Sequence, residues 1–537
     1  MSAPHAGHFH WRLLAGFLAA ACAYLFFLDP WGHDTWFHLQ RLQDIERQLA
    51  WGHWRAYFAE NAAQGKGLSV WIYYSQWIYW PAILLTSIDV SPLVALKLVY
   101  CVLLVVCCVG CYRLLRLHVG ETEAAFGTLL FMTSNYVVGE VFQRSAYSEF
   151  MSVALLPMLL VAMHRVVLHD DRRAGTTLAV LAALMILAHP LSFMNSGVAL
   201  VAYAACVGLK EQVPARRFIG LLPLLALGLA LSAFYWLPAV IETKYVLGAE
   251  GVPTPLSETF LSIGRYLKFS GITSLGLVLT LLAPVVTVCM MLRRRGQDDP
   301  TERSWWALLA AVAVYVFLTF RVSEPLYDAL PLLASNLWVW RVLFQVTLLT
   351  ALIVAVGLPA LPQRLRSPAV LRGLALVGVL QATALVAWNT RDEVSLRPMP
   401  VRAIEARIAV ESQFKDGFGI DEYLPQPRLL PRLDGECAYV RTMEPNGRYE
   451  MSYVVVAGDA DACIHIPRYW NTRYAASIDD VPIPVYADQN GEMLIAPAGR
   501  AGVLDLRFTS PGYVSVSTLL SGAAALFLLL RVTRGRR

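Results

Sequence analysis

Long apolar runs alternate with short polar loops along most of the chain. A run of roughly 17 to 25 apolar residues can cross a bilayer as one helix. Because such runs recur, the first one is better explained as an uncleaved span than as a signal peptide. The pattern predicts about twelve spans, near residues 11–28, 89–111, 122–139, 148–166, 175–189, 191–208, 217–240, 272–293, 304–320, 336–359, 369–388 and 513–531.

The polar loops between these spans give the predicted orientation. Basic residues gather in every second loop, in HRVVLHDDRR, KEQVPARR, RRRGQDDPTER, QRLRSPAVLR and the terminal RVTRGRR. Short loops rich in Lys and Arg stay on the cytoplasmic side of a membrane. We therefore expect both termini in the cytoplasm and the first polar loop, residues 29–70 with the motif GHDTWFHLQRL, on the outer side.

The pattern changes between residues 389 and 511, where hydropathy falls. EPNGRYEMSYVVV and VYADQNGEMLIAP each place an Asn-Gly turn signal beside alternating apolar residues, which is typical of β-hairpins. The sequence thus predicts an all-α transmembrane domain over 1–388, an outside, mainly β domain over 389–511, and a last span with a basic tail over 512–537. Cys437 and Cys463 both fall in the outside domain, where oxidation is permitted, so we predict a disulfide between them.

Composition and charge agree with this division. The 537 residues are 57% hydrophobic and 15% charged, with a mean hydropathy of +0.51, which indicates a polytopic membrane protein. Residues 389–511 hold 13 Lys and Arg against 18 Asp and Glu, so the net charge of +5 comes from the rest of the chain. The basic excess belongs to the inward loops, and it indicates no nucleic-acid partner.

The first outer loop carries candidate chemistry. Asp34, His38 and Arg41 are spaced so that all three fall on one face of a helix. They are either solvated charges, with Asp34 as the helix N-cap, or part of a site. The other face is apolar at helical spacing, which predicts an amphipathic helix on the membrane surface: Trp36, Leu39, Leu42, Ile45 and Leu49.

The outer ends of other spans add ionisable residues at the same depth. Acids and cations collected there suit a substrate with an anionic head and a lipid tail, because cations bind the phosphate while the tail stays in the bilayer. A transporter would instead place ionisable residues and helix breaks near the middle of several spans. The residues are Arg144 and Glu149 in VFQRSAYSEF, His189 in LAHPLSF, Glu242 and Lys244 in AFYWLPAVIETKYV, and Arg341 in ASNLWVWRVLFQ.

Together with GKGLSVWIYYSQWIYWP and the C-terminal β domain, these motifs resemble the YfhO-like bacterial membrane proteins of the GT-C class of glycosyltransferases. The resemblance implies an inverting enzyme of the bacterial cytoplasmic membrane with its active site facing the periplasm. Its donor would be a polyprenyl-phosphate-linked sugar, and its acceptor a glycan, lipid or protein. By position it implies Asp34 and Glu149 as catalytic acids and Arg341 and Arg144 as the residues that hold the donor phosphate.

Transfer from a lipid phosphate needs a base for the acceptor proton and a cation for the departing phosphate. Asp34 would be that base and Arg341 that cation. His38 is either a ligand for a divalent cation such as Mg²⁺ or Mn²⁺ beside Asp34, or a structural hydrogen-bond partner. Glu242 is either a substrate group or a helix anchor. Further candidates for substrate or metal contacts are Arg41, His189 and Lys244.

Two other functions stay open from the sequence. A flippase for lipid-linked glycans, or another multi-pass transporter, would need a polar path across the membrane. A non-catalytic assembly protein would use the β domain to hold partners and would leave Asp34 and Arg341 without a shared cavity.

Overall fold

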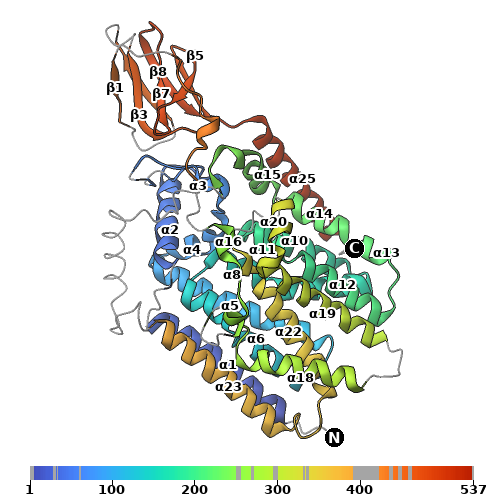
Figure 1. The fold of residues 1–537 in the computed structure, drawn as a ribbon. Coiled ribbons are helices and arrows are strands. Elements are labelled where there is room, and N and C mark those ends of the chain that lie inside the picture. Colours follow the sequence, from blue (N-terminus) through green and yellow to red (C-terminus); the bar gives the residue numbers. More distant parts are fainter. Residues whose placement is uncertain are drawn as a thin grey trace.

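The structure is a bundle of helices with a β domain at one end (Figure 1). It is a computed structural model, and it describes residues 5–27, 32, 34–59, 62–63, 65–248, 255–267, 271, 273–293, 300–330, 333, 338–390, 423–434, 439–444, 450–456 and 462–534.

The first half of the bundle contains a long helix that follows the first outer loop and several that are broken by short turns. These elements are α1 (His5–Phe27), α2 (Thr35–Ala50), α3 (Val70–Tyr73), η1 (Trp77–Tyr79), α4 (Trp80–Thr86), α5 (Pro92–Arg116), α6 (Glu121–Met132), α7 (Asn135–Val138), η2 (Gly139–Arg144), α8 (Tyr147–Val153), α9 (Leu156–His169), α10 (Arg172–Ala188), α11 (Pro190–Asn195) and α12 (Gly197–Glu211).

The second half completes the bundle and ends in a helix that follows the β domain. Its helices are α13 (Arg216–Ile219), α14 (Leu221–Leu231), α15 (Ala233–Glu242), η3 (Thr243–Tyr245), α16 (Leu256–Thr259), α17 (Ile263–Leu267), α18 (Leu277–Arg293), α19 (Pro300–Thr319), η5 (Arg321–Ser323), α20 (Glu324–Ala329), η6 (Val339–Val342), α22 (Leu343–Gly357), η7 (Leu358–Ala360), α23 (Pro368–Thr390), η9 (Pro427–Leu429) and α25 (Gly512–Arg534).

Seven helical segments of the described chain are long and apolar enough to cross a membrane, against the twelve predicted. An eighth forms if the pair Arg216–Leu231 and Ala233–Tyr245, which bends by 75°, is one span. Three more apolar helices are shorter, Trp77–Thr86, Leu277–Leu292 and Ser304–Thr319. The seven are Phe9–Phe26, Pro92–Arg116, Tyr147–His169, Pro190–Glu211, Val339–Ala360, Pro368–Trp388 and Gly512–Thr533.

The predicted span 122–139 shows how a break can divide one apolar run into two helices. It is divided into α6 and α7, because Ser134 leaves the helix and its hydroxyl accepts a hydrogen bond from the Val137 N–H at 3.4 Å. The 75° bend likewise falls at Ser232, whose hydroxyl donates to the carbonyl of Gly228 at 3.0 Å. Serine hydroxyls that compete for helix carbonyls are a known cause of bends. Apolar composition continues through both breaks, so hydropathy does not register them.

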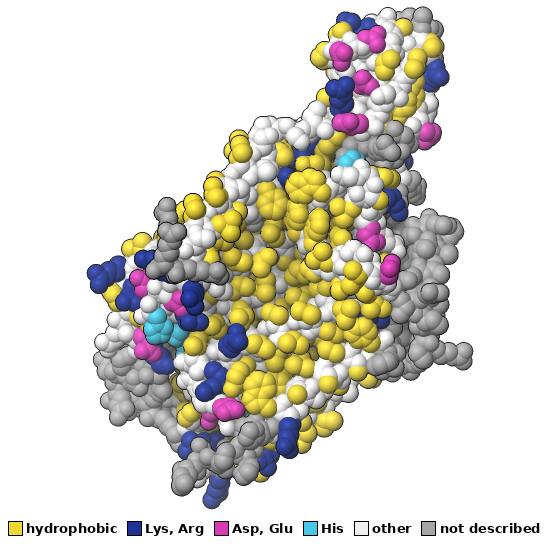
Figure 2. Space-filling model, turned by 180° about the vertical axis from the view of Figure 1, so that it is seen from behind, with side chains coloured by type: hydrophobic (Ala, Val, Ile, Leu, Met, Phe, Trp, Pro, Cys, Tyr) yellow, Lys and Arg dark blue, Asp and Glu magenta, His cyan; other side chains and the backbone are white. Residues whose placement is uncertain are grey.

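The surface has the character of a membrane protein. Figure 2 shows a broad hydrophobic area between the β domain and the opposite end, where Lys and Arg gather. Large apolar side chains are exposed on the candidate spans, including Val201 on α12 and Leu519 on α25. Such surface is unfavourable in water and is suited to lipid contact.

The two ends of the bundle can be told apart by the elements that meet there. α25 starts at the β domain. Near its other end, Arg531 lines a cavity together with Asp170, which directly follows α9, so α25 and α9 end at the same end of the bundle, away from the β domain. The candidate span Tyr147–His169 therefore begins at the end that carries the β domain. In Figure 1 the start of α1 and the end of α25 both lie on the side away from the β strands.

The β domain contains two four-stranded sheets, with strand orders β1-β3-β7-β6 and β2-β8-β4-β5. All pairs are antiparallel except β1 with β3, where Val440 pairs with Cys463. The predicted β character of this region is confirmed. The strands are β1 (Val440–Thr442), β2 (Met451–Val455), β3 (Cys463–Tyr469), β4 (Tyr474–Ile478), β5 (Val481–Ile483), β6 (Val485–Ala487), β7 (Glu492–Ile495) and β8 (Gly502–Phe508).

The first outer loop packs into this β domain. Phe58 is 1% exposed and belongs to the same core cluster as the strand residues, in edge contact with Tyr474 and Phe508. Cys463, at the start of β3, is disulfide-bonded, and its predicted partner Cys437 lies outside the described residues. The loop that carries the candidate site and the β domain thus share one core.

Candidate functional site

The helix predicted after the first span forms as α2, but it is not a surface helix. Leu39, Leu42 and Ile45 on its apolar face are at most 1% exposed. The polar face is buried as well, since His38 is 3% and Arg41 0% exposed. The prediction of an amphipathic helix on the membrane surface is therefore wrong: protein, not lipid and water, covers both faces.

Asp34 stands at the start of α2, beside the segment that ends η2. It occupies the N-cap position, but its carboxylate makes no capping hydrogen bond. Its backbone N–H donates to the carbonyl of Arg144 at 2.8 Å, and the Thr35 hydroxyl donates to that of Ser145 at 2.9 Å. Gly32 permits this close approach, because a Cβ there would collide with the side chain of Ser145. Asp34 and Arg144 are thus held together across more than a hundred residues of chain.

A buried cluster of two acids and two arginines lies next to Asp34. The Arg144 Nη1 contacts Glu140 Oε1 at 2.5 Å and Glu149 Oε2 at 3.0 Å. The Arg341 Nε lies 3.3 Å from the same Oε2 of Glu149, and the Tyr136 hydroxyl donates to Glu149 Oε1 at 3.0 Å. The structure therefore brings together Arg144, Glu149 and Arg341, which the sequence placed at the outer ends of different spans.

Local backbone geometry aims Arg144 into the cluster. It closes η2, a π-helical turn, and Ser145 after it adopts a left-handed conformation with φ of 56°. π-helical turns are rare in proteins, and those that occur are often found at functional sites. The guanidinium also lies over the Trp340 ring, 4.7 Å from its centroid. Trp340 is adjacent to Arg341 in η6, so one turn supplies both the aromatic ring under Arg144 and the second arginine that contacts Glu149.

The two kinds of side chain in the cluster differ in exposure. Glu149 is 3% exposed, whereas Arg144 and Arg341 are 15% and 16% exposed. Among the residues that the structure describes, the terminal nitrogens of Arg341 make no hydrogen bond. A planar guanidinium with free donors suits the oxygens of a phosphate. The arginines can reach a ligand, and the carboxylate beneath them fixes their positions.

Glu149 itself is poorly suited to act as a base. Both of its oxygens are engaged, one with Tyr136 and the other with the two arginines. Two cations in contact stabilise the ionised form of a carboxylate and lower its tendency to take a proton. This geometry favours Glu149 as a residue that positions the arginines.

His38 hydrogen-bonds through both ring nitrogens. Nε2 accepts from the Tyr147 N–H at 3.3 Å, so Nδ1 carries the proton and donates to the Tyr79 hydroxyl at 2.8 Å. Burial, with the positive charges of Arg41 and Arg144, holds the pKa of His38 well below its ordinary value. Neither nitrogen is left for a metal, so His38 does not fit the metal-ligand role. No three His, Cys, Asp or Glu side chains of the described chain are grouped as a metal site.

Arg41 is enclosed by aromatic rings. Its guanidinium lies 3.5 Å from the centroid of Phe37 and 3.7 Å from that of Tyr74, a cation–π arrangement that compensates burial of the charge. Arg41 also contributes to the low pKa of His38. The helix spacing placed Asp34, His38 and Arg41 on one face, and the structure keeps that face inside the protein.

Three other predicted residues have different surroundings. Glu242, 0% exposed, pairs with Arg473 of the β domain through both of its oxygens. Lys244 is exposed, with its Nζ 4.9 Å from the Tyr245 centroid. His189 is the N-cap of α11, and its Nδ1 lies 2.8 Å from the Ser192 hydroxyl. The pairing of Glu242 with Arg473 favours the interpretation of Glu242 as a helix anchor over that of a substrate group.

Sequence reasoning missed three buried residues of this region. Glu140 precedes Arg144 by four residues, which on a helix is ion-pair spacing and was a usable signal. Tyr136 lies one helical turn further back and carried no such signal. Asp44, on α2, accepts a hydrogen bond from Trp71 Nε1 at 2.8 Å, and burial raises its pKa to about 7.

The fold defines a polytopic membrane protein with a β domain at one end and a charged cluster at the ends of its helices. The chain belongs to a family described as 6-pyruvoyl-tetrahydropterin synthase related domain, membrane protein, whose model matches residues 72–390. That match covers more than half of the chain and confirms the membrane class. No curated protein matches the sequence.

Solved structures with a similar arrangement come from three sources. A mutant of the mycobacterial arabinofuranosyltransferase AftD aligns at a TM-score of 0.47 with 17% identity, over 73% of this chain and 28% of that one. The oligosaccharyltransferase of Archaeoglobus fulgidus, in the apo form, gives 0.45 and 13%, over 81% and 62%. ArnT from Cupriavidus metallidurans, bound to undecaprenyl phosphate, gives 0.45 and 13%, over 90% and 98%.

The chain thus spans less than a third of AftD and less than two thirds of the oligosaccharyltransferase. All three TM-scores are below 0.5, so the assignment of a function rests on the site of this chain.

Proposed function

We propose that this protein is a membrane glycosyltransferase, which moves a sugar from a polyprenyl-phosphate donor to a glycan, lipid or protein acceptor. The reaction takes place at the end of the bundle that carries the β domain, on the periplasmic side of a bacterial cytoplasmic membrane. The observation that carries this proposal is Arg341, held by Glu149 at the end of a candidate span, with its terminal nitrogens unengaged in the described chain and Asp34 tied to the neighbouring Arg144.

The reaction is a single displacement that inverts the anomeric carbon. The acceptor oxygen forms a bond to this carbon while its proton passes to the carboxylate of Asp34. The bond from the carbon to the phosphate oxygen breaks, and its electron pair leaves with the polyprenyl phosphate. Arg341 and Arg144 stabilise the charge that develops on the phosphate, in a partly water-excluded site where such contacts are strong. The polyprenyl chain stays in lipid beside the helices.

Each acid then has a separate task. Asp34 contacts the acceptor and takes its proton. Glu149 and Glu140 are positioning residues, because each contacts Arg144 and Glu149 also contacts Arg341. No step requires a metal ion, and His38, which could have held one beside Asp34, hydrogen-bonds through both nitrogens to the protein.

The decisive test is Asp34→Asn, because asparagine has nearly the same shape but accepts no proton. A general base contributes roughly 10²–10⁴ in rate, so transfer should fall by about that factor. Binding of the polyprenyl-phosphate donor and thermal stability should stay close to those of the unaltered protein, because asparagine keeps nearly the same shape and is an equally good residue at the N-cap position that Asp34 occupies. The measurement is transfer from a panel of polyprenyl-phosphate sugars in reconstituted membranes.

The matched control is Glu46→Gln, which removes a carboxylate from the same helix at a position where the described chain offers it no ion pair. Glu46→Gln should keep full activity. If Asp34→Asn transfers sugar at a near-normal rate, Asp34 is not the base and the proposed mechanism fails. Movement of intact donor across the membrane without transfer would instead favour a flippase.

A further inference from the structure

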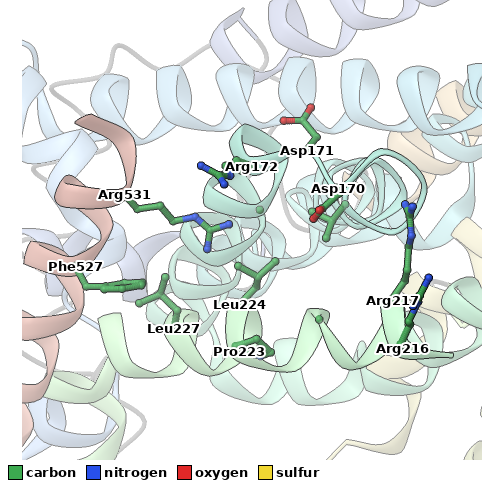
Figure 3. Close-up of a pocket in the computed structure, with 13 residues that line it drawn as sticks. Asp170, Asp171, Arg172, Arg216, Arg217, Pro223, Leu224, Leu227, Phe527 and Arg531 are labelled. Carbon is green, nitrogen blue, oxygen red and sulfur yellow. The ribbon is translucent and has the colours of Figure 1, made fainter. Parts of the chain in front are cut away.

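A second group of arginines surrounds a cavity (Figure 3). Arg531 lines it at the end of α25, the helix that starts at the β domain, so the cavity lies at the end of the bundle away from that domain. The cavity, of about 520 Å³, lies between the end of α9, the start of α10, α13, α14 and the end of α25. Four arginines line it, Arg172, Arg216, Arg217 and Arg531, and its apolar wall contains Pro223, Leu224, Leu227 and Phe527.

Two of the charges around the cavity are engaged with the protein. The Arg217 Nη1 donates to the carbonyls of Val167 at 3.1 Å and Leu168 at 2.8 Å, near the end of α9. Asp171 accepts from the N–H of Arg173 at 2.9 Å as the N-cap of α10, and it pairs with Arg165 at 2.7 Å. These contacts build the wall of the cavity and hold Arg217 Nη1 and the Asp171 carboxylate in place.

The other three arginines have no such partner. Within the part of the chain that the structure describes, Arg172, Arg216 and Arg531 make no ion pair and no side-chain hydrogen bond. Arg531 reaches across from α25 to α10, and a Cβ at Gly175 would lie 3.0 Å from its Nη2. Figure 3 shows Arg172 and Arg531 extending into the same part of the cavity. Two acids, Asp170 and Asp171, line the cavity beside the four arginines, so the excess charge is positive.

The position of the cavity indicates which anion it accepts. Candidate spans end there: Tyr147–His169 stops at its wall, the bent pair starts at Arg216, and Gly512–Thr533 ends beside Arg531. The exposed Phe527 and Leu222 continue an apolar surface from the cavity along α25 and α14. Positive groups at span ends above lipid-facing apolar surface match a molecule with a phosphate head and acyl chains.

We propose that this cavity binds an anionic phospholipid, with the headgroup phosphate held by Arg172, Arg216 and Arg531 and the acyl chains along α14 and α25. The lipid would bridge α25, the helix that follows the β domain, to α10 and α14. It would thereby stabilise the attachment of α25 to the bundle. This site lies at the opposite end from the proposed glycosyl-transfer site, and it does not depend on that function.

The test uses the full-length protein in micelles of a neutral detergent. Phosphatidylglycerol and phosphatidylcholine are titrated separately, and bound lipid is counted by native mass spectrometry while the melting temperature is recorded. We expect phosphatidylglycerol to bind at least about 10-fold more tightly and to raise the melting temperature, because its phosphate leaves a net negative charge, whereas the choline of phosphatidylcholine offsets that charge and is repelled by the arginines. Equal binding of the two lipids would overturn the proposal. Inorganic phosphate should not stabilise the protein, and if it does so as well as phosphatidylglycerol, the ligand is a free phosphate.

Variants distinguish binding of phosphatidylglycerol at this cavity from a general attraction of the lipid to basic surface. Arg172→Gln with Arg531→Gln should weaken phosphatidylglycerol binding by about 10- to 30-fold. Arg364→Gln with Arg366→Gln, which removes two exposed arginines of another loop, should leave it unchanged. Arg172→Lys with Arg531→Lys keeps the charges and should retain most of the binding. Normal phosphatidylglycerol binding by the Gln pair, or an equal loss in the Arg364 and Arg366 control, would contradict the proposal.

Discussion

The Glu242–Arg473 pair and the Glu149 cluster use the same side-chain types at the same end of the bundle, yet they differ in exposure. Both Glu242 and Arg473 are 0% exposed, so the pair is closed to any ligand. In the cluster the carboxylate of Glu149 is buried at 3%, whereas Arg341 is 16% exposed. The chemistry of an acid–arginine pair therefore does not define its role; the access of the arginine to other partners does.

This difference corresponds to what each pair connects. Glu242 ends α15 and Arg473 precedes β4, so their contact joins the bundle to the β domain. Tyr73 adds to this joint, since its hydroxyl donates to the Glu242 carbonyl at 3.0 Å. Glu149, by contrast, holds two arginines at the ends of candidate spans, beside Asp34. We regard the first pair as an anchor and the second as a ligand site.

The largest expected effect on stability comes from breaking the anchor. Arg473→Met leaves the Glu242 carboxylate buried without a cation, and an uncompensated buried charge typically costs about 3–5 kcal/mol. We expect the free energy of unfolding, measured by denaturant titration in micelles, to fall by that amount. Glu242→Leu combined with Arg473→Met removes both charges and should recover most of the loss. If Arg473→Met is as stable as the unaltered protein, the contrast between the two pairs is lost.

The cluster should respond in binding and not in stability. Arg341→Lys keeps the charge but removes the planar fork, and hydrogen bonds to charged groups contribute about 1.5–3 kcal/mol. Donor binding should weaken by about 10- to 150-fold with little change in melting temperature. Arg321→Lys, at an arginine that is 74% exposed and pairs with Glu324, is the control and should bind donor normally. A large loss of stability in Arg341→Lys would identify a second anchor.

A smaller effect, on the pH dependence of stability, is expected from α2. Two of its buried side chains, His38 and Asp44, have shifted pKa values that change stability with pH in opposite directions. The pKa of His38 lies below 6.5, so the unfolded chain binds more protons just below that pH and His38 makes stability rise with pH. The pKa of Asp44 is raised to about 7, so the folded chain binds more protons between 3.8 and 7 and Asp44 makes stability fall with pH. The two contributions oppose each other just below pH 6.5.

Single substitutions should reveal each slope in the pH dependence of the melting temperature. Asp44→Asn removes the falling contribution, so between pH 5 and 6.5 the variant should gain stability as pH rises relative to the unaltered protein. His38→Gln should change the dependence in the opposite direction. Each difference is at most about 1.4 kcal/mol per pH unit. Parallel pH profiles for both variants would show that these groups are not buried in the folded protein.

The smallest effect is expected at the exposed contact between the first outer loop and the β domain. The Lys66 Nζ lies 2.6 Å from Glu492 Oε1, but the lysine side chain is 36% exposed. Pairs that reach water contribute at most about 1 kcal/mol. Lys66→Met should therefore lower the free energy of unfolding by less than 1 kcal/mol, well below the cost of Arg473→Met. Equal costs for the two variants would remove exposure as the factor that ranks these pairs.

The sequence by itself determined the elements that repeat a local pattern. Apolar runs located the helices of the candidate spans, helical spacing located α2, and Asn-Gly turns with alternating residues located the β domain. These features depend on neighbours within a few residues, which the sequence displays directly. The same information placed Arg144, Glu149 and Arg341 near the outer ends of helices.

Only the tertiary structure decided what those residues contact and how far they are buried. Hydropathy could not register the breaks at Ser134 and Ser232, since the apolar composition continues through them. The spacing that grouped Asp34, His38 and Arg41 could not reveal that protein covers this face of α2. Glu242 meets Arg473 across 231 positions of the chain. A pairing of that kind depends on how distant segments pack, and the packing fixes which charges are enclosed and which can reach a ligand.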